Sequence, residues 1–518
     1  MNTDKLFGES SVWKVIAKMS IPAIVTMLVM VLYSMADMLF VGLQGDPSQI
    51  AAISLVSPVF MIMMGIGTLI GGGGCAAIAK TLGNKDLGKA KTLSSLCFML
   101  CLALGTVLAA ATLLNLNGIV RLLGANSDTM ESASSYLGWL VAGAPVIVFT
   151  NAFANIIRAE GSAKEAMIGN GISTVTNIVL DPLFILVFGM GVSGAAIATV
   201  IGNLAGAVYL IFYIVRKSGS LSLNPKEAAK APKQVGIILA LGLPSAASNF
   251  MVSVAHALQN RVVAGYGSDT IAAIGVAGKA TLLVVMVIMG ICIGVQPAMA
   301  YNYGAKNVPR TWELLKKTGI VTLVTGLTLT AICYVCTKPL VSLFLQDPSL
   351  MSLSMRIARI HLLTAPILGL FYLSANFLQS SGNAFFATFL AILRQGLILL
   401  PVFYILNALA GLNGIIAAPI ATDVIAIAIG LVLCRLQYGR FKKNCLREAE
   451  VGAERAEAIE GIEGIEGEEE IEAIEVRDVI GEKDATGEKD AVGERDAIGE
   501  RDAIGGRGAI GERPDMAT

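Results

Sequence analysis

The sequence has few charged and few aromatic side chains for its length. Of its 518 residues 15% are charged and 6% are aromatic, whereas 55% are hydrophobic and the mean hydropathy is +0.71. These values are typical of a chain with long apolar segments and exclude a set of ordinary soluble domains. The basic residues form no stripe with interleaved aromatic residues, so we expect no nucleic acid as a partner.

Motifs for catalysis and metal binding are also missing. The eight cysteines lie mostly in apolar stretches, and the close pair Cys333 and Cys336 has neither a second pair nor histidines beside it. We therefore expect reduced, hydrophobic cysteines. The chain has no His-Glu-x-x-His, no Gly-x-Ser-x-Gly and no paired aspartates for a diphosphate held through Mg²⁺. The sequence predicts neither an enzyme nor a resident cofactor.

Long apolar runs, in contrast, are abundant. A run of about 20 residues crosses about 30 Å of hydrocarbon as a helix, and twelve such runs precede residue 448. Their approximate extents are 17–43, 49–79, 93–116, 134–157, 164–188, 192–215, 236–265, 270–302, 316–337, 357–379, 384–408 and 411–436. The first run has full spanning length and no cleavage site after a short core, which argues against a signal peptide. The sequence predicts an all-α membrane protein with twelve transmembrane helices.

The basic residues indicate how these helices are oriented. Lysine and arginine concentrate near the N-terminus and in the even-numbered loops, for example Lys80, Lys85 and Lys89 after the second run. Short cytoplasmic loops accumulate such residues. We expect a multi-pass protein of the cell (inner) membrane with both termini in the cytoplasm.

Glycine and proline reveal an internal repeat with a spacing of about 220 residues. The matching pairs are Pro22 with Pro244, Gly67 and Gly71 with Gly290 and Gly294, Gly83 with Gly304, Gly161 with Gly382, Pro182 with Pro401, and Gly194 with Gly414. The sequence predicts two homologous six-helix halves, 1–215 and 236–447, joined by a cytoplasmic linker, 216–235. Because six is even, both halves enter the membrane in the same direction, as in alternating-access transporters. We expect a central cavity and a rocking motion of one half on the other.

The C-terminal tail differs from the rest of the chain. Residues 448–518 hold 23 acidic and 8 basic side chains, whereas residues 1–447 hold 15 acidic and 30 basic ones. The tail contains Ile-Glu-Gly triplets and then a six-residue repeat from Gly481 onward. Such a composition cannot bury enough apolar surface to offset the entropy of ordering. We expect a disordered, solvated tail.

Ionisable residues inside spanning helices are costly and usually functional. Asp37 and Asp181 lie in the outer half of the predicted N-terminal bundle, and Thr199 falls at a similar depth. Asn177 precedes Asp181 by four residues and so shares its helical face. Carboxylate, amide and hydroxyl oxygens suit a proton or Na⁺. The alternative is that Asp181 caps backbone broken at Pro182 and that Asp37 lines a wet vestibule.

Further polar residues fall within the predicted helices of the C-terminal half. Arg394 and Asp423 are both expected near the midplane, where pairing would relieve the cost of burying each charge. The pair has either a structural role or a role in handling substrate or ion, and the sequence does not decide between them. His256 is a candidate for lining the cavity, and Gln259 and Asn260 in the same predicted helix are candidates for a cavity or structural role.

Several segments together resemble the multidrug and toxic compound extrusion (MATE) family of antiporters. They are Asp37-Met-Leu-Phe-Val-Gly42, Arg158-Ala-Glu-Gly161, Asn177-Ile-Val-Leu-Asp181-Pro182, Gly191-Val-Ser-Gly-Ala-Ala-Ile-Ala-Thr199, Gly294-Val-Gln-Pro-Ala-Met-Ala-Tyr-Asn-Tyr-Gly-Ala-Lys306 and Leu393-Arg394-Gln395. The resemblance covers about residues 15 to 440 and leaves out the tail. It implies export of amphipathic, often cationic compounds in exchange for H⁺ or Na⁺, by a monomer in the lipid bilayer.

The resemblance also implies roles for particular residues. It places the coupling site on Asp37, Asn177, Asp181 and Thr199, with no metal beyond Na⁺, and makes Pro22 the hinge of the first helix. Some branches of the family have an acidic residue in the seventh helix. This chain has His256, Gln259 and Asn260 there, so we expect no second cation site. In this respect it resembles the bacterial branch related to the DNA-damage-inducible member.

One alternative function remains within the same superfamily. A flippase for lipid-linked precursors usually has extra helices and a cationic central cavity, and twelve helices with few buried cations favour export instead. The sequence specifies neither the substrate nor the choice between H⁺ and Na⁺, because a promiscuous cavity is defined by its shape.

Overall fold

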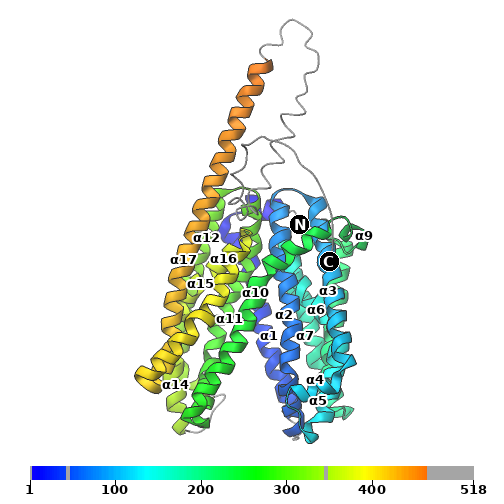
Figure 1. Cartoon of the computed structure of the whole chain (residues 1–518), viewed down its shortest axis with the longest axis vertical. Coiled ribbons are helices and arrows are strands. Elements are labelled where there is room, and N and C mark those ends of the chain that lie inside the picture. The colour runs from blue at the N-terminus through cyan, green and yellow to red at the C-terminus, as the bar shows by residue number, and fades with distance from the viewer. Residues whose placement is uncertain (1–2, 43–46, 343–347, 464–518) are drawn as a thin grey trace, which may run out of the picture. The chain divides into compact units, whose positions relative to one another are not determined.

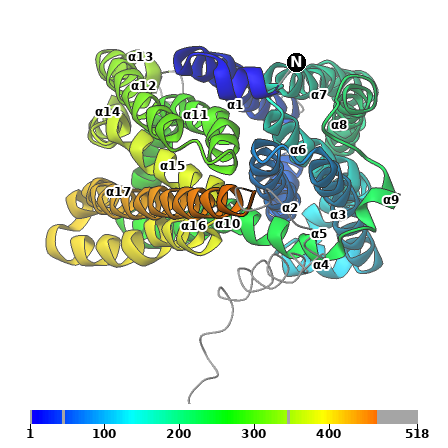
Figure 2. The same ribbon diagram turned by 90° about the horizontal axis from the view of Figure 1, so that it is seen from above.

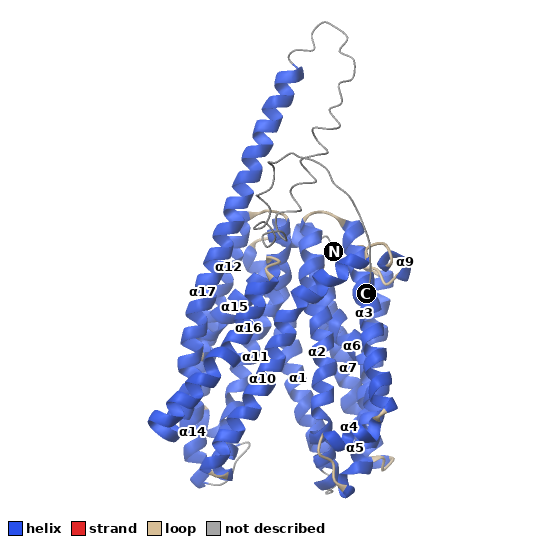
Figure 3. Cartoon of the chain, in the orientation of Figure 1, coloured by secondary structure: helices blue, strands red, loops and turns tan. Residues whose placement is uncertain are grey.

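The structure is a computed structural model, and it describes residues 3–42, 47–342 and 348–463. Over this part of the chain the regular elements are helices, without a strand (Figure 3). By its internal contacts the chain divides into two compact units, Met1–Leu446 and Arg447–Thr518. The prediction of an all-α membrane protein is confirmed.

The described residues of the N-terminal half of the first unit form eight α-helices and two π-helical turns (Figure 1). They are η1 (Lys5–Glu9), α1 (Val12–Gly42), α2 (Pro47–Gly83), α3 (Leu87–Leu114), α4 (Leu116–Leu122), α5 (Ser127–Ala142), α6 (Ala144–Ala159), α7 (Ala163–Pro182), η2 (Leu183–Val187) and α8 (Gly191–Arg216). The π-turn η2 follows Pro182, whose missing N–H interrupts the helical hydrogen bonds.

The C-terminal half follows after a short connection, which consists of α9 (Pro225–Ala228) and η3 (Pro232–Gln234). Its elements are α10 (Val235–Val263), η4 (Ala264–Tyr266), α11 (Ser268–Gly304), α12 (Val308–Val335), α13 (Thr337–Ser342), α14 (Pro348–Leu362), α15 (Ala365–Ser380), α16 (Ala384–Ile392), η5 (Leu393–Ile398) and α17 (Leu399–Glu463). The connection is packed against the N-terminal half, because Leu221 and Ala228 are buried and Ser94 Oγ donates to the Ser222 carbonyl at 2.9 Å.

Membrane spans can be counted from these helices. Among the described residues nine helices are long and apolar enough to cross a membrane, and two bent pairs, α5 with α6 and α14 with α15, make eleven. The segment Ala384–Val451 is 68 residues long and covers two predicted runs. At Gly411 it has φ 55° and ψ −135°, a conformation that favours glycine. A break at this glycine separates the eleventh and twelfth predicted spans.

The internal repeat is visible in the backbone. The two bent pairs have similar angles, 55° for α5–α6 and 48° for α14–α15. Each pair is followed by a glycine with positive φ, Gly161 at 86° and Gly382 at 89°. The starts of α3 and α12 are capped alike, since Asp86 accepts from the Lys89 N–H and Asn307 accepts from the Arg310 N–H. The two halves are therefore homologous in structure, as the glycine spacing predicts.

The two halves meet where helices cross at glycines. In Figure 2 they lie side by side, with α1 next to α11 and α2 next to α10. At four positions a Cβ atom would lie within about 2 Å of a carbonyl oxygen of the other half. These are Gly73 at 1.9 Å from Ile238 O, Gly242 at 1.8 Å from Leu69 O, Gly83 at 2.0 Å from Tyr301 O, and Gly304 at 2.0 Å from Lys80 O.

All these crossings lie toward one end of the helices. The C-terminal end of α2 contacts the C-terminal end of α11, and the N-terminal part of α10 crosses α2. Toward the opposite end, where α5 and α14 lie, α1 and α2 diverge from α10 and α11 (Figure 1). We call the end with the crossings the closed end.

The tail is only partly described. Helix α17 extends to Glu463, so residues 448–463 are helical, in contrast to the disorder expected for the whole tail. This stretch is rich in alanine and glutamate, which are strong helix formers. The prediction for residues 464–518 lies outside the described residues.

Candidate functional site

Helix α7 positions two of the four predicted cation-site residues. Asn177 and Asp181 are one turn apart on α7, and both side chains are buried, with 3% and 0% of their surface exposed. A buried carboxylate in an apolar bundle requires hydrogen bonds or a bound cation. The amide of Asn177 is one such partner, at 3.3 Å from Asp181 Oδ1.

Thr199 completes this group from the neighbouring helix, α8. Its hydroxyl lies 3.3 Å from the Asn177 amide, and 4% of the residue is exposed. The amide of Asn177 is best satisfied with its nitrogen toward Asp181 Oδ2, at 3.1 Å, and its oxygen toward the Thr199 N–H, at 3.1 Å. In either orientation Asn177 bridges Asp181 and Thr199.

Glycines on α8, which were not among the predicted site residues, make this approach possible. A Cβ on Gly202 would lie 2.6 Å from Ser173 O and 3.0 Å from Asn177 Cβ, and a Cβ on Gly206 would lie 2.9 Å from Gly169 O. The spacing Gly202-x-x-x-Gly206 is a signal for close helix packing in membranes. With larger residues there, Thr199 would be held away from Asn177.

The remaining predicted residues of this half lie on α1. Asp37 is part of α1, and its side chain lies outside the described residues. Pro22 lies within the same helix, and the hydroxyl of Thr26 donates to the Pro22 carbonyl at 2.9 Å. Because α1 contacts both α7 and α11, it connects the candidate cation site to the interface between the halves.

In the C-terminal half the expected ion pair forms. Arg394 Nε in η5 lies 2.9 Å from Asp423 Oδ1 in α17. The guanidinium also lies over the rings of Phe371 and Tyr372, with 5.2 Å and 5.8 Å to the ring centres. Thr364, which was not among the predicted site residues, donates to Asp423 Oδ2 at 3.1 Å. Both charged side chains thus have their ion-pair, ring and hydrogen-bond partners within the C-terminal half, as a structural role requires.

The predicted polar residues of α10 do not join this ion pair. His256 and Asn260 are exposed and Gln259 is half-buried, and their spacing places them on one face of α10. They lie beyond the segment of α10 that crosses α2, which is near Ile238 and Gly242. Their part in lining a cavity stays a prediction.

Comparison with known protein families agrees with the repeat. A family model described as MatE matches residues 22–183 and matches again over residues 244–405. One match falls in each half, and together they cover more than half of the chain.

Individual relatives extend the likeness over most of both chains. The multidrug export protein MepA of Staphylococcus aureus (strain NCTC 8325) is 32% identical over 432 residues, which cover 83% of this chain and 95% of the relative. MepA of Staphylococcus saprophyticus is 31% identical over 436 residues, with the same coverage.

A solved structure has the same architecture. It is described as the outward-facing conformation of a multidrug resistance MATE family transporter of the MOP superfamily, with a TM-score of 0.81, 25% identity and coverage of 86% of this chain and 99% of that one. The family model, the relatives and the fold agree. The chain therefore belongs to the MATE family of multidrug export transporters.

Proposed function

We propose that this protein exports amphipathic, often cationic compounds across the cell membrane in exchange for H⁺ or Na⁺. The observation that carries the proposal is the complete burial of Asp181 beside Asn177 and Thr199. An ionised carboxylate in this position is costly unless a cation neutralises it. The relatives supply the substrate class, since they are described as multidrug export proteins.

The donor set accommodates either coupling ion. A proton would bind to the Asp181 carboxylate itself, whereas Na⁺ would use the carboxylate, the Asn177 amide oxygen and the Thr199 hydroxyl, all of which are hard oxygen donors. Asp37 completes the proposed site from α1. No other metal and no cofactor enters the proposed cycle.

Helix α1 is the proposed route from the ion to the substrate pathway. Pro22 cannot donate to the carbonyl of Lys18, so α1 bends more easily there than elsewhere. Two residues earlier, Ser20 Oγ donates to the Ile291 carbonyl of α11 at 3.2 Å. A bend at Pro22 on cation binding would therefore act directly on the contact between the halves.

The proposed movement is a rocking of the two halves that opens the closed end while the diverging ends come together. Basic residues gather at the closed end, among them Lys80 at the end of α2 and Arg310 at the start of α12. By the positive-inside rule this end faces the cytoplasm, as do both termini. The described conformation would then be open to the outside, like the outward-facing transporter of similar fold. We expect the protein to act as a monomer.

Ethidium efflux from cells that express the protein tests the proposal. We expect efflux that depends on the ion gradient and disappears in Asp181→Asn, because the amide cannot bind a proton or balance Na⁺. Adding a protonophore or removing Na⁺ then identifies the coupling ion. Unchanged efflux in Asp181→Asn would refute the coupling site.

Glu160→Gln provides a matched control. Glu160 is also a buried carboxylate of the N-terminal half, but it lies at the closed end, where it accepts from Tyr213, Ser218 and Ser220. The ion dependence of efflux should survive this change in folded protein. A folded wild type that exports no dye at all would contradict drug export and favour the flippase alternative.

A further inference from the structure

We propose that residues Thr3–Ser10, which we call the N-terminal clasp, fasten the two halves to each other at the closed end and must release Arg310 whenever that end opens. The clasp precedes α1 and therefore belongs to the N-terminal half by sequence. Most of its polar contacts are nevertheless made with the C-terminal half. The inference rests on the proposed alternating access, because a clasp is meaningful only if the closed end opens.

The C-terminal half holds the clasp through Tyr301, Asn302 and Arg310, which lie near the α11–α12 turn. Arg310 Nε donates to the Phe7 carbonyl at 2.6 Å, and Arg310 Nη2 donates to the Ser10 carbonyl. Asn302 Nδ2 donates to the same Phe7 carbonyl at 3.1 Å. One guanidinium thus binds the carbonyl of the middle residue of η1 and that of the residue directly after η1, and the planar group of arginine favours such a double contact.

A carboxylate and an aromatic ring add to this attachment. The Tyr301 hydroxyl donates to Asp4 Oδ1 at 2.5 Å. The ring of Phe7 lies 5.5 Å from the ring of Tyr301, at 56°, and Phe7 is fully buried, with 0% exposure. Opening the closed end would separate these groups and expose the phenylalanine to water, which is unfavourable.

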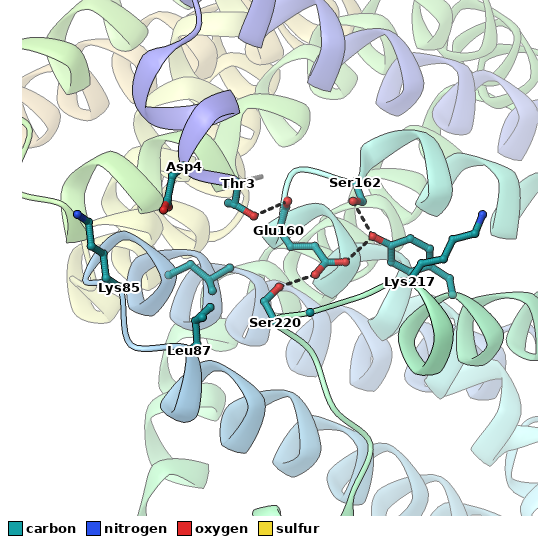
Figure 4. Close-up of a pocket in the computed structure, with 11 residues that line it drawn as sticks. Thr3, Asp4, Lys85, Leu87, Glu160, Ser162, Lys217 and Ser220 are labelled. Atoms are coloured by element: carbon teal, nitrogen blue, oxygen red, sulfur yellow. Dashed lines mark hydrogen bonds between the residues drawn. The ribbon is translucent and has the colours of Figure 1, made fainter. Parts of the chain in front are cut away.

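The N-terminal half holds the other side of the clasp at the turn between α6 and α7. Thr3 Oγ1 donates to the Glu160 carbonyl at 3.0 Å (Figure 4). A Cβ on Gly161 would lie 2.9 Å from Leu6 Cδ2 and 3.5 Å from Phe7 Cζ, so Phe7 is packed between this turn and Tyr301. The clasp therefore touches both halves at once.

The turn itself is a firm anchor. The Glu160 carboxylate accepts from the hydroxyls of Tyr213 at 2.6 Å, Ser218 at 2.7 Å and Ser220 at 2.5 Å. These bonds, part of which Figure 4 shows, tie the turn to α8 and to the segment that follows it. A cavity of about 300 Å³ lies beside Thr3 and Asp4.

The covalent connection of the clasp to α1 determines which of its contacts break when the closed end opens. The clasp continues into α1 after Ser11, and its anchor is also in the N-terminal half, so a rocking movement carries it away from Arg310, Asn302 and Tyr301. The hydrogen bonds to Arg310 are charge-assisted and hence among the stronger ones. They stabilise the conformation with this end closed and set part of the barrier to its opening.

Thiol labelling of a single reporter tests the clasp. In a full-length variant without the eight native cysteines, Ser20→Cys places a thiol between α1 and α11, where Ser20 is buried and bonds to Ile291. The probe is a water-soluble maleimide, applied to the reconstituted protein. Arg310→Gln and Tyr301→Phe should each raise the labelling rate, Arg310→Gln by about tenfold, because two charge-assisted bonds are lost.

Tyr209→Phe is the matched control, because the Tyr209 hydroxyl also donates to a carboxylate, that of Glu165, but within one half. It should leave the labelling rate unchanged. Equal rates in Arg310→Gln, Tyr301→Phe and the parent, with thermal unfolding showing that all are folded, would overturn the clasp. Efflux measured on the same proteins tests the proposed function separately. A parent variant that exports nothing would contradict drug export, whereas the labelling rates would still show whether the clasp exists.

Discussion

The crossing of α2 and α10 gives a sharp prediction about the conformational equilibrium. In Gly242→Ala the added Cβ would lie 1.8 Å from Leu69 O and 2.7 Å from the Leu69 carbonyl carbon. Both neighbours are backbone atoms and cannot rotate away. The helices must separate by about 1.4 Å or more to reach normal contact, which forfeits much of their dispersion attraction.

The magnitude follows from the cost of overpacking. Extra atoms in a packed interface cost about 1–3 kcal/mol, and here the cost falls on the conformation with this end closed. A change of that size moves a two-state equilibrium by about 5- to 150-fold. We therefore expect Gly242→Ala to favour the opposite conformation, in which the diverging ends of the halves come together.

Distances between spin labels measure this shift. Leu114 at the end of α3 and Leu409 near the Gly411 break are 88% and 77% exposed and lie at the end away from the crossings. In a cysteine-free background, labels at these sites should show a larger population of short distances in Gly242→Ala than in the parent.

Gly236→Ala is the control on the same helix, because nothing lies within 4 Å of its added Cβ. It should leave the distance distribution unchanged and stabilise α10 by up to about 1 kcal/mol, since alanine is the better helix former. Identical distributions for Gly242→Ala and Gly236→Ala would refute the argument that close backbone contact at Gly242 sets the equilibrium.

Two further predictions concern the interior of each half. Asp423→Asn should lower the free energy of unfolding, measured in thermal unfolding, by about 3–5 kcal/mol, because Arg394 is left buried without its charge partner. The double variant Arg394→Met with Asp423→Leu should recover most of this loss. A double variant as unstable as the single one would contradict a structural role for the pair. Gly202→Ala should abolish ion-dependent efflux, because the new Cβ would lie 2.6 Å from Ser173 O and would force α8 away from α7. In the control Gly171→Ala on α7 the added Cβ meets nothing within 4 Å, so this variant should transport normally. Equal efflux in both variants would show that the α7–α8 spacing is unimportant.

Much of the fold could be predicted because the membrane itself constrains the sequence. A helix must be apolar over about 20 residues to span hydrocarbon, so the spans are readable one by one, and the repeated glycines identify the two halves. Helical periodicity also sufficed to place Asn177 beside Asp181. The pairing of Arg394 with Asp423 was predictable because two buried charges at one depth have few other ways to be neutralised.

The contacts between segments far apart in sequence were not predictable in this way. No local pattern in the sequence indicates that Thr364 hydrogen-bonds to Asp423 or that Arg310 binds the clasp. Nor does a local pattern indicate that the missing side chain of Gly202 allows the close approach of Asn177. The bend of α5 against α6 does have a local signal, because Pro145 stands at the start of α6. The apolar run 134–157 nevertheless continues across the bend and predicts a single straight span.

The sequence by itself thus determined the helices, their number, their repeat and the burial of some polar residues, among them Asn177, Asp181 and Asp423. Only the tertiary structure decided which end of the two halves is closed and what fastens it. The physical reason is that burial in the bilayer acts on each helix separately, whereas the crossings at Gly73 and Gly242 and the clasp depend on backbone groups that become neighbours only after both halves have folded.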